Sequence, residues 1–123
     1  ATNLLVPLAG AERTTAAARA LGATRTVVAR GVEDGPAFRR GLNNVTTAAD
    51  RAALLVAVET GRAASPAGTA TLRALLLAQE FADAIPAGLP PGTPVGHKTG
   101  EIGGTLHDAA IVYPPGRAPY VLV

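Results

Sequence analysis

The chain has 123 residues and contains no cysteine, one serine and one lysine. The absence of cysteine excludes disulfide bonds and thiol catalysis, although it does not fix the cellular compartment. The serine, Ser65, precedes Pro66, and this pair is typical of the start of a helix. A hydrolase that depends on a nucleophilic serine is therefore incomplete within these residues.

Aromatic residues and long apolar runs are also scarce. Hydrophobic residues make up 48% of the chain, but the aromatic ones are only Phe38, Phe81, Tyr113 and Tyr120. The core must therefore consist of leucine, valine and alanine. No segment approaches the roughly 20 apolar residues of a membrane span, and residues 4–9 are too short for a signal peptide. The length fits one small domain or part of a larger one.

The charges are few and scattered. Eleven basic and nine acidic residues give a formal net charge of +2, and the only adjacent arginines are Arg39 and Arg40. Nucleic-acid-binding proteins usually show a clustered basic face, so we expect no nucleic-acid partner. The two histidines and the dispersed acids have no metal-ligand spacing, so we expect no metal.

Helices are predicted in the first two thirds of the chain. Residues 3–6 fit the end of a helix that Gly10 breaks, and residues 11–21 fit a second helix ended by Gly22. Residues 24–45 fit a loop with a turn of helix near residues 37–40.

Two further helix starts are marked by their capping residues. Thr47 and Asp50 fit a capping-box variant, in which the hydroxyl accepts a first-turn N–H and the carboxylate reaches back. That helix ends at Gly61, and another begins at Ser65. Residues 81–85 fit either a short continuation of it or a separate turn.

After these helices, the spacing of the apolar residues changes to the two-residue period of β-strands. Residues 95–101, 106–113 and 119–123 fit three antiparallel strands, with a turn at residues 114–117. Helices followed by an antiparallel meander define an α+β fold. Such a small sheet has exposed edges, which are an aggregation hazard unless they are covered. We therefore expect partner strands outside this chain.

The lone lysine is the main candidate functional residue. Lys98 lies in His97-Lys98-Thr99-Gly100, where an ammonium, a hydroxyl and a glycine on one strand suit recognition of a carboxylate. The alternative is a solvated lysine at a sheet edge. The segment is also close to a phosphate-binding loop, but the extra His97 and the strand that follows argue against nucleotide binding.

The chain resembles the C-terminal half of the class A β-lactamases and related serine hydrolases, whose motifs include S-x-x-K, S-D-N and K-T-G. The resemblance rests on the Lys98-Thr99-Gly100 strand, on the hairpin through residues 102–113, and on residues 1–5 and 44–50, in the expected order. It implies a β-lactamase or penicillin-binding-protein-like fold of helices packed on an antiparallel sheet. Residues 1–123 would form the C-terminal portion of one such domain.

The resemblance also implies a set of site residues. Lys98, Thr99 and Gly100 would bind the carboxylate of a β-lactam or a D-Ala-D-Ala-like peptide. The N–H of Glu101 would supply half of an oxyanion hole. His107 lies near the position where many members carry an arginine that binds the substrate carboxylate. The alternative is a strand-end histidine bonded to Asp108 or to the main chain.

The resemblance does not identify a single base for deacylation. By resemblance, residues 30–36 form the omega loop, and Glu33 and Asp34 are the candidate bases, but the family's Arg-x-Glu-Pro pattern is absent. The alternative is a structural carboxylate paired with Arg30 or Arg39. Without a base, the protein would act as a penicillin-binding trap or an esterase.

The sequence therefore predicts part of a serine-dependent acyl-transfer hydrolase. Its partners would be a small-molecule substrate and the N-terminal remainder of the same domain, with the nucleophile in that remainder. The chain begins at Ala1 rather than Met, which fits a processed product or a piece of a longer protein. We expect residues 1–123 alone to be inactive, no cofactor, and a periplasmic or secreted location. The alternatives are a non-catalytic carboxylate-binding or assembly fragment and a D-Ala-D-Ala peptidase.

Overall fold

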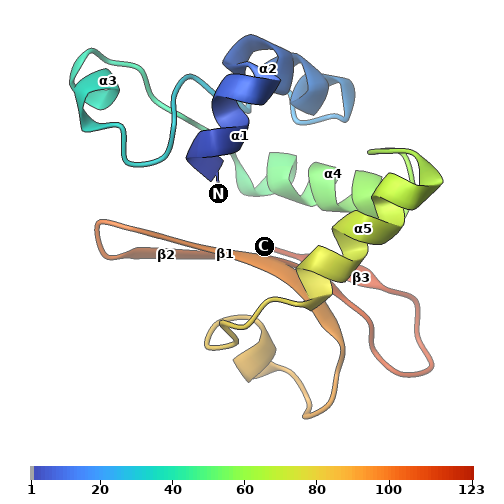
Figure 1. Cartoon of the computed structure of the whole chain (residues 1–123). Coiled ribbons are helices and arrows are strands. Elements are labelled where there is room, and N and C mark those ends of the chain that lie inside the picture. Colours follow the sequence, from blue (N-terminus) through green and yellow to red (C-terminus); the bar gives the residue numbers. More distant parts are fainter. Residues whose placement is uncertain (1) are drawn as a thin grey trace. The chain divides into compact units, whose positions relative to one another are not determined.

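Helices come first along the chain and strands last, as the sequence predicts (Figure 1). The computed structural model describes residues 2–123, so Ala1, the first residue of the resemblance, lies outside the described part. The described residues divide between Asp50 and Arg51 into two units, and each is considered by itself. Among residues 2–123, every helix is too short or too polar to cross a lipid bilayer.

The first unit contains three helices before the division. They are α1 (Thr2–Ala9), α2 (Ala11–Ala20) and α3 (Gly35–Arg39). Gly10, with φ of 80°, separates α1 from α2, since few other residues adopt this backbone conformation without strain. Helix α2 ends where predicted, and the short α3 confirms the expected turn of helix.

Asp50 holds the loop of the first unit. Its N–H donates to the Thr47 hydroxyl (3.1 Å), as the capping pattern predicts. Its carboxylate does not reach back as expected. Instead it accepts the Arg25 N–H (2.8 Å) and the Thr26 hydroxyl (2.7 Å). These donors lie in a loop whose main chain lacks the regular hydrogen bonds of a helix or sheet. The Asp50 side chain, which is only 5% exposed, therefore supplies an acceptor for them.

The second unit contains the remaining helices and the sheet. Helix α4 (Ala48–Glu59) crosses the division, and α5 (Pro66–Leu77), the short 3-10 helix η1 (Pro86–Gly88), β1 (Val95–Ile102), β2 (Thr105–Val112) and β3 (Tyr120–Leu122) follow. Ser65 caps α5 by accepting the Gly68 N–H (3.2 Å), which confirms its structural role. Residues 81–85 are a separate turn that leads into η1.

The strands form the predicted antiparallel meander in the order β1-β2-β3. One face is packed by helices: Ala109 and Ile111 form a core with Leu55 of α4, and Leu76 of α5 packs against it. A Cβ on Gly96 would meet the Leu76 Cβ at 3.3 Å, so α5 lies close to the β1 backbone. The segment before β1 crosses the opposite face (Figure 1).

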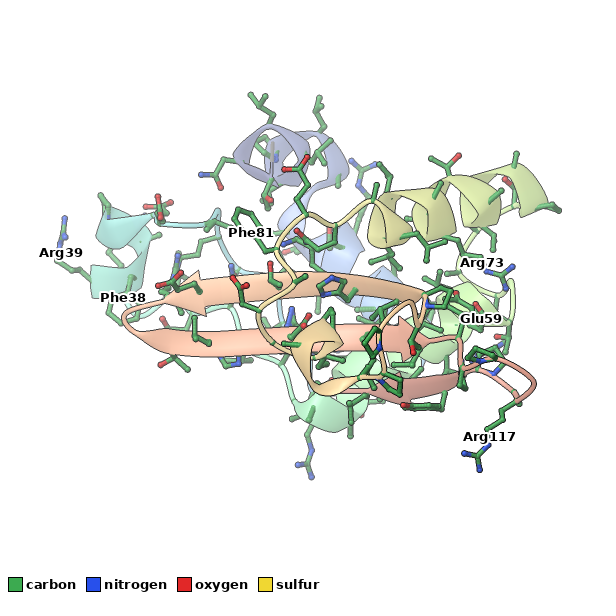
Figure 2. The ribbon with its side chains drawn as sticks, turned by 90° about the horizontal axis from the view of Figure 1, so that it is seen from below. Phe38, Arg39, Glu59, Arg73, Phe81 and Arg117 are labelled. Carbon is green, nitrogen blue, oxygen red and sulfur yellow. The ribbon has the colours of Figure 1, made fainter. Side chains whose placement is uncertain are left out.

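A polar cluster joins both helices to the end of β2. Arg73 of α5 pairs with Glu59 of α4 (Nε to Oε2, 3.1 Å), as Figure 2 shows, and also donates to the Glu59 carbonyl. The Tyr113 hydroxyl donates to the same Glu59 oxygen (2.8 Å). Burial, and then the bond to Glu59, raise the pKa of Tyr113 to about 12. Tyr113 therefore stays protonated and keeps donating at any physiological pH.

We predict that Asp50→Asn reduces the dependence of stability on acid pH. The Thr26 hydroxyl bond, followed by smaller main-chain bonds, lowers the pKa of Asp50 below its ordinary value of 3.8. A lowered folded-state pKa stabilises the protein above the ordinary value and loses that effect as pH falls through the folded value. Urea unfolding between pH 7 and pH 2 should show wild type and variant converging in acid. Glu80→Gln, at an exposed position, is the control, and parallel pH curves for wild type and Asp50→Asn would contradict the prediction.

We predict that Gly96→Val destabilises the sheet of the second unit. The new side chain must displace α5, because the Leu76 Cβ and Leu77 Cγ lie 3.3 and 3.6 Å from the position of the first added carbon. Overpacking of this kind costs about 1–3 kcal/mol. Gly88→Val is the matched control, since nothing lies within 4 Å of its added Cβ. Equal urea midpoints for both variants would show that α5 does not constrain β1.

Candidate active site

Lys98, Thr99 and Gly100 lie in the middle of β1, one of the two edge strands of the sheet among the described residues. Within residues 2–123, β1 pairs only with β2, so its other edge is open. A phosphate-binding loop must open a helix, whose N–H groups then face the anion. Lys98 lies within a strand instead, so this segment does not have the geometry of a phosphate-binding loop.

A cavity of about 600 Å³ adjoins this part of the strand. It brings together five of the residues singled out from the sequence: Lys98, Thr99, Gly100, Glu101 and His107. Leu106 of β2 completes that side, and the opposite wall comes from the turn before η1: Phe81, Asp83 and Ala84. Figure 2 shows Phe81 on this segment. The cavity thus combines cationic, anionic and apolar groups.

The strand register determines which main-chain groups face the open edge. The Tyr113 N–H donates to the Pro94 carbonyl (3.0 Å), one step beyond the Val95 and Val112 pair. Bonded and non-bonded pairs alternate along an antiparallel ladder. Counting from Pro94, the N–H and C=O groups of Thr99 and Glu101 point away from β2. The Glu101 N–H is therefore available to a ligand at this edge.

Lys98 is exposed, and its ammonium lies over the same edge. Its Nζ donates to the Thr99 carbonyl (2.6 Å), which is one of the groups that point away from β2. An ammonium has three N–H donors, so two remain for a bound anion. Successive strand side chains point to opposite faces, so Lys98 and Thr99 approach the cavity from the two sides of the edge.

His107 lies opposite Gly100 in the register and is exposed to the cavity. The alternative, in which it bonds to Asp108, is wrong. Asp108 pairs with His97, whose Nδ1 lies 3.0 Å from Oδ1. Because strand side chains alternate, His107 and Asp108 face opposite sides of β2.

The pair of His97 and Asp108 was missed from the sequence, although the signal was present. Gly103 and Gly104 have φ values of 55° and 77° and form a two-residue turn. Consecutive residues with positive φ are typical of a tight hairpin. A hairpin centred there fixes the register and places residues 97 and 108 on one face.

Glu33 and Asp34 belong to the first unit, whereas the cavity is lined by the second unit alone. Asp34 is the N-cap of α3, and its Oδ1 accepts the Ala37 N–H (2.9 Å). The expected pairing with Arg30 or Arg39 is wrong, because neither arginine forms a salt bridge with Asp34 among residues 2–123, and Arg30 donates to the carbonyls of Leu42 and Gly31. A structural role for Asp34 is therefore confirmed, but as a helix cap.

Glu33 has the unusual backbone of this loop. It is exposed, and its φ of 60° is the one positive value at a non-glycine position among residues 2–123. Such a conformation costs about 1–3 kcal/mol and is enriched at functional sites. Its side chain is not held by the capping interaction that occupies Asp34.

Comparison with known proteins gives the family. Over residues 1–123 the chain matches the Beta-lactamase enzyme family. It belongs to that family. The helices followed by an antiparallel sheet agree with the fold of the solved β-lactamases and penicillin-binding proteins that it matches.

Three similar proteins illustrate the match. The β-lactamase CTX-M-25 from Escherichia coli is 56% identical over 43 residues, 34% of this chain and 15% of that protein. A β-lactamase structure from Sphaerobacter thermophilus is 28% identical with a TM-score of 0.84, covering 98% of this chain and 45% of that one. A point variant of PBP-A, solved as an acyl-enzyme complex with penicillin-G, is 29% identical with a TM-score of 0.80, covering 93% and 41%.

The chain therefore spans less than half the length of these proteins. Its membership of the Beta-lactamase enzyme family agrees with the order of helices and antiparallel strands described above.

We predict that Asp34→Ala destabilises the first unit by about 1 kcal/mol, because the Ala37 N–H loses its cap. Glu33→Gly should not destabilise, because glycine adopts the φ of 60° without strain. Chemical unfolding of the two variants gives the comparison. A larger loss for Glu33→Gly would show that its side chain makes a structural contact after all.

Proposed function

We propose that this chain forms the carboxylate-binding edge of a serine acyl-transfer hydrolase of the Beta-lactamase enzyme family. The substrate would be a β-lactam or a D-Ala-D-Ala-like peptide. The observation that supports this most is the cavity at the open edge of β1, which gathers Lys98, Thr99, Gly100 and Glu101. The nucleophilic serine would come from residues outside this chain, since Ser65 caps a helix.

In this proposal, Lys98 and Thr99 bind the substrate carboxylate. The ammonium contributes charge and two uncommitted N–H donors, and the hydroxyl contributes one more. Hydrogen bonds to charged groups contribute about 1.5–3 kcal/mol. Gly100 has no side chain, so the substrate can approach the strand. His107 would provide a further polar contact from β2.

The open edge would also supply part of the oxyanion hole. As an acyl carbonyl is attacked, its oxygen becomes negative, and a fixed N–H stabilises that charge. The Glu101 N–H points away from β2 by the register argument above, and it follows directly after the carboxylate-binding residues. Carboxylate and reacting carbonyl would therefore be aligned along one strand.

The rate of deacylation would decide between the possible activities. Glu33 and Asp34 are the proposed bases for the attacking water, and of the two, Glu33 is not committed to capping α3. If either acts, the protein turns over β-lactams. If neither does, the acyl-enzyme persists, and the protein is a penicillin-binding protein or a D-Ala-D-Ala peptidase. The capping role of Asp34 and the missing Arg-x-Glu-Pro pattern favour this second candidate.

A location outside the cytoplasm is part of the proposal, because β-lactams and cell-wall peptides are encountered there. It rests on family membership. Fractionation of the source cells, followed by detection of the protein with an antibody, would test it.

The full-length protein that carries these residues should react with a chromogenic β-lactam. Stopped-flow absorbance would separate an acylation burst from steady turnover, and intact-mass spectrometry would detect the covalent adduct. A burst without turnover supports the penicillin-binding candidate, whereas turnover supports the β-lactamase. If the protein shows no burst and forms no adduct, the proposal is refuted.

We predict that Lys98→Ala lowers the second-order acylation rate roughly 10- to 100-fold, which corresponds to the loss of a charged hydrogen bond. Lys98→Arg should retain part of the rate, because it keeps the charge. Arg117→Ala is the matched control, since Arg117 is an exposed cation on the turn between β2 and β3 (Figure 2). An equal loss in Lys98→Ala and Arg117→Ala would indicate a nonspecific effect of charge.

A further inference from the structure

His97 and Asp108 form a buried polar pair directly behind the cavity. Both side chains are 3% exposed, and the His97 Nδ1 lies 3.0 Å from Oδ1 and 3.1 Å from Oδ2 of Asp108. The pair lies on the face of the sheet opposite Lys98, because His97 is opposite Ala110 and Asp108 is opposite Thr99 in the register. The proposed chemistry uses neither residue.

The Asp108 carboxylate also holds the opposite wall of the cavity. Its Oδ2 accepts the Ile85 N–H (3.1 Å), and its Oδ1 accepts the Ala109 N–H (2.9 Å). Ile85 directly follows Phe81, Asp83 and Ala84, which form that wall. Between Leu77, where α5 ends, and Pro94, this is the one recorded hydrogen bond that joins the segment to the paired strands among the described residues.

His97 completes the set of hydrogen bonds around the Asp108 carboxylate, which anchors Ile85 and the wall before it. A carboxylate that already accepts two main-chain N–H groups needs a donor on its remaining lone pairs when it is buried. His97 meets this need only if Nδ1 carries the proton, so the carboxylate fixes the tautomer. The imidazole in turn fixes the carboxylate that accepts from Ile85. Removing the ring would leave a buried carboxylate with fewer donors and a weaker hold on the wall.

We propose that His97 and Asp108 are positioning residues that set the distance between the 81–85 wall and the open edge of β1. This inference rests on the proposed function for its effect on acylation. The pair does not touch the substrate. It holds Phe81 and Asp83 against the edge that carries Thr99 and Glu101, so that a substrate is gripped from both sides. A small displacement of such a wall would weaken the grip on the substrate and so lower the second-order acylation rate by up to about 100-fold.

The test compares three variants of the full-length protein. His97→Leu removes the donor, His97→Asn returns an N–H near the Nδ1 position, and Ile111→Val weakens the core on the other face of the same sheet. Hydrogen–deuterium exchange over residues 79–88 reports the anchor directly. The concentration dependence of acylation by a chromogenic β-lactam separates substrate binding from the chemical step.

We expect His97→Leu to speed exchange at residues 81–85 about tenfold or more and to weaken β-lactam binding by roughly 10- to 100-fold. The chemical step should change much less. His97→Asn should restore most of both, and Ile111→Val should change neither. Unchanged exchange in His97→Leu, or an equal loss of binding in Ile111→Val, would overturn the inference.

The exchange measurement also separates this inference from the proposed function. If the wild-type protein forms no β-lactam adduct, the acyl-transfer proposal fails, whatever the variants do. If the adduct forms and only the exchange result is negative, the proposed function stands and the positioning role fails.

Discussion

The site depends on one constraint, the pairing of β1 with β2 across eight residue pairs. This ladder determines which N–H and C=O groups of β1 bond to β2 and which face the open edge. It also sorts the side chains, since His97 and Asp108 share one face of the sheet, whereas Lys98 and His107 lie on the face of Ala109 and Ile111. A slip of one residue would move every side chain of the slipped strand to the opposite face of the sheet. The core of Leu55, Ala109 and Ile111 opposes such a slip, because it would lose its apolar partners.

Two buried carboxylates organise the two units in a similar way. Asp50 accepts donors from the loop at Arg25 and Thr26, and Asp108 accepts them from Ile85 and Ala109. In each case the donors belong to chain segments without ladders of their own. A buried acceptor with several donors gives such segments a defined position. These two irregular segments are therefore held by single carboxyl side chains, whereas the core of the sheet is held by leucine, isoleucine and alanine packing.

Much of the fold could be predicted, because helices and strands are encoded locally. The Ser65-Pro66 start, the Gly10 break and the alternation from Val95 onward each depend on a few neighbouring residues. The role of Asp34 as a helix cap is also encoded locally, by the proline two residues later, whereas Asp34 is interpreted from the sequence as a candidate base or as half of an ion pair. Asp50 accepts from Arg25, and Asp108 accepts from Ile85, and in each pair the two residues are more than 20 positions apart in the sequence. No local pattern specifies such contacts, so the anchors could only be seen in the structure.

The scarcity of lysine has a practical consequence. Lys98 carries the one side-chain amine of these 123 residues, and that amine is exposed at the cavity. Amine-reactive reagents, which leave guanidinium groups largely untouched, would modify this part of the protein at a single side chain. The chain thus contains a natural attachment point for a fluorophore or a crosslinker, placed where a ligand would compete with it.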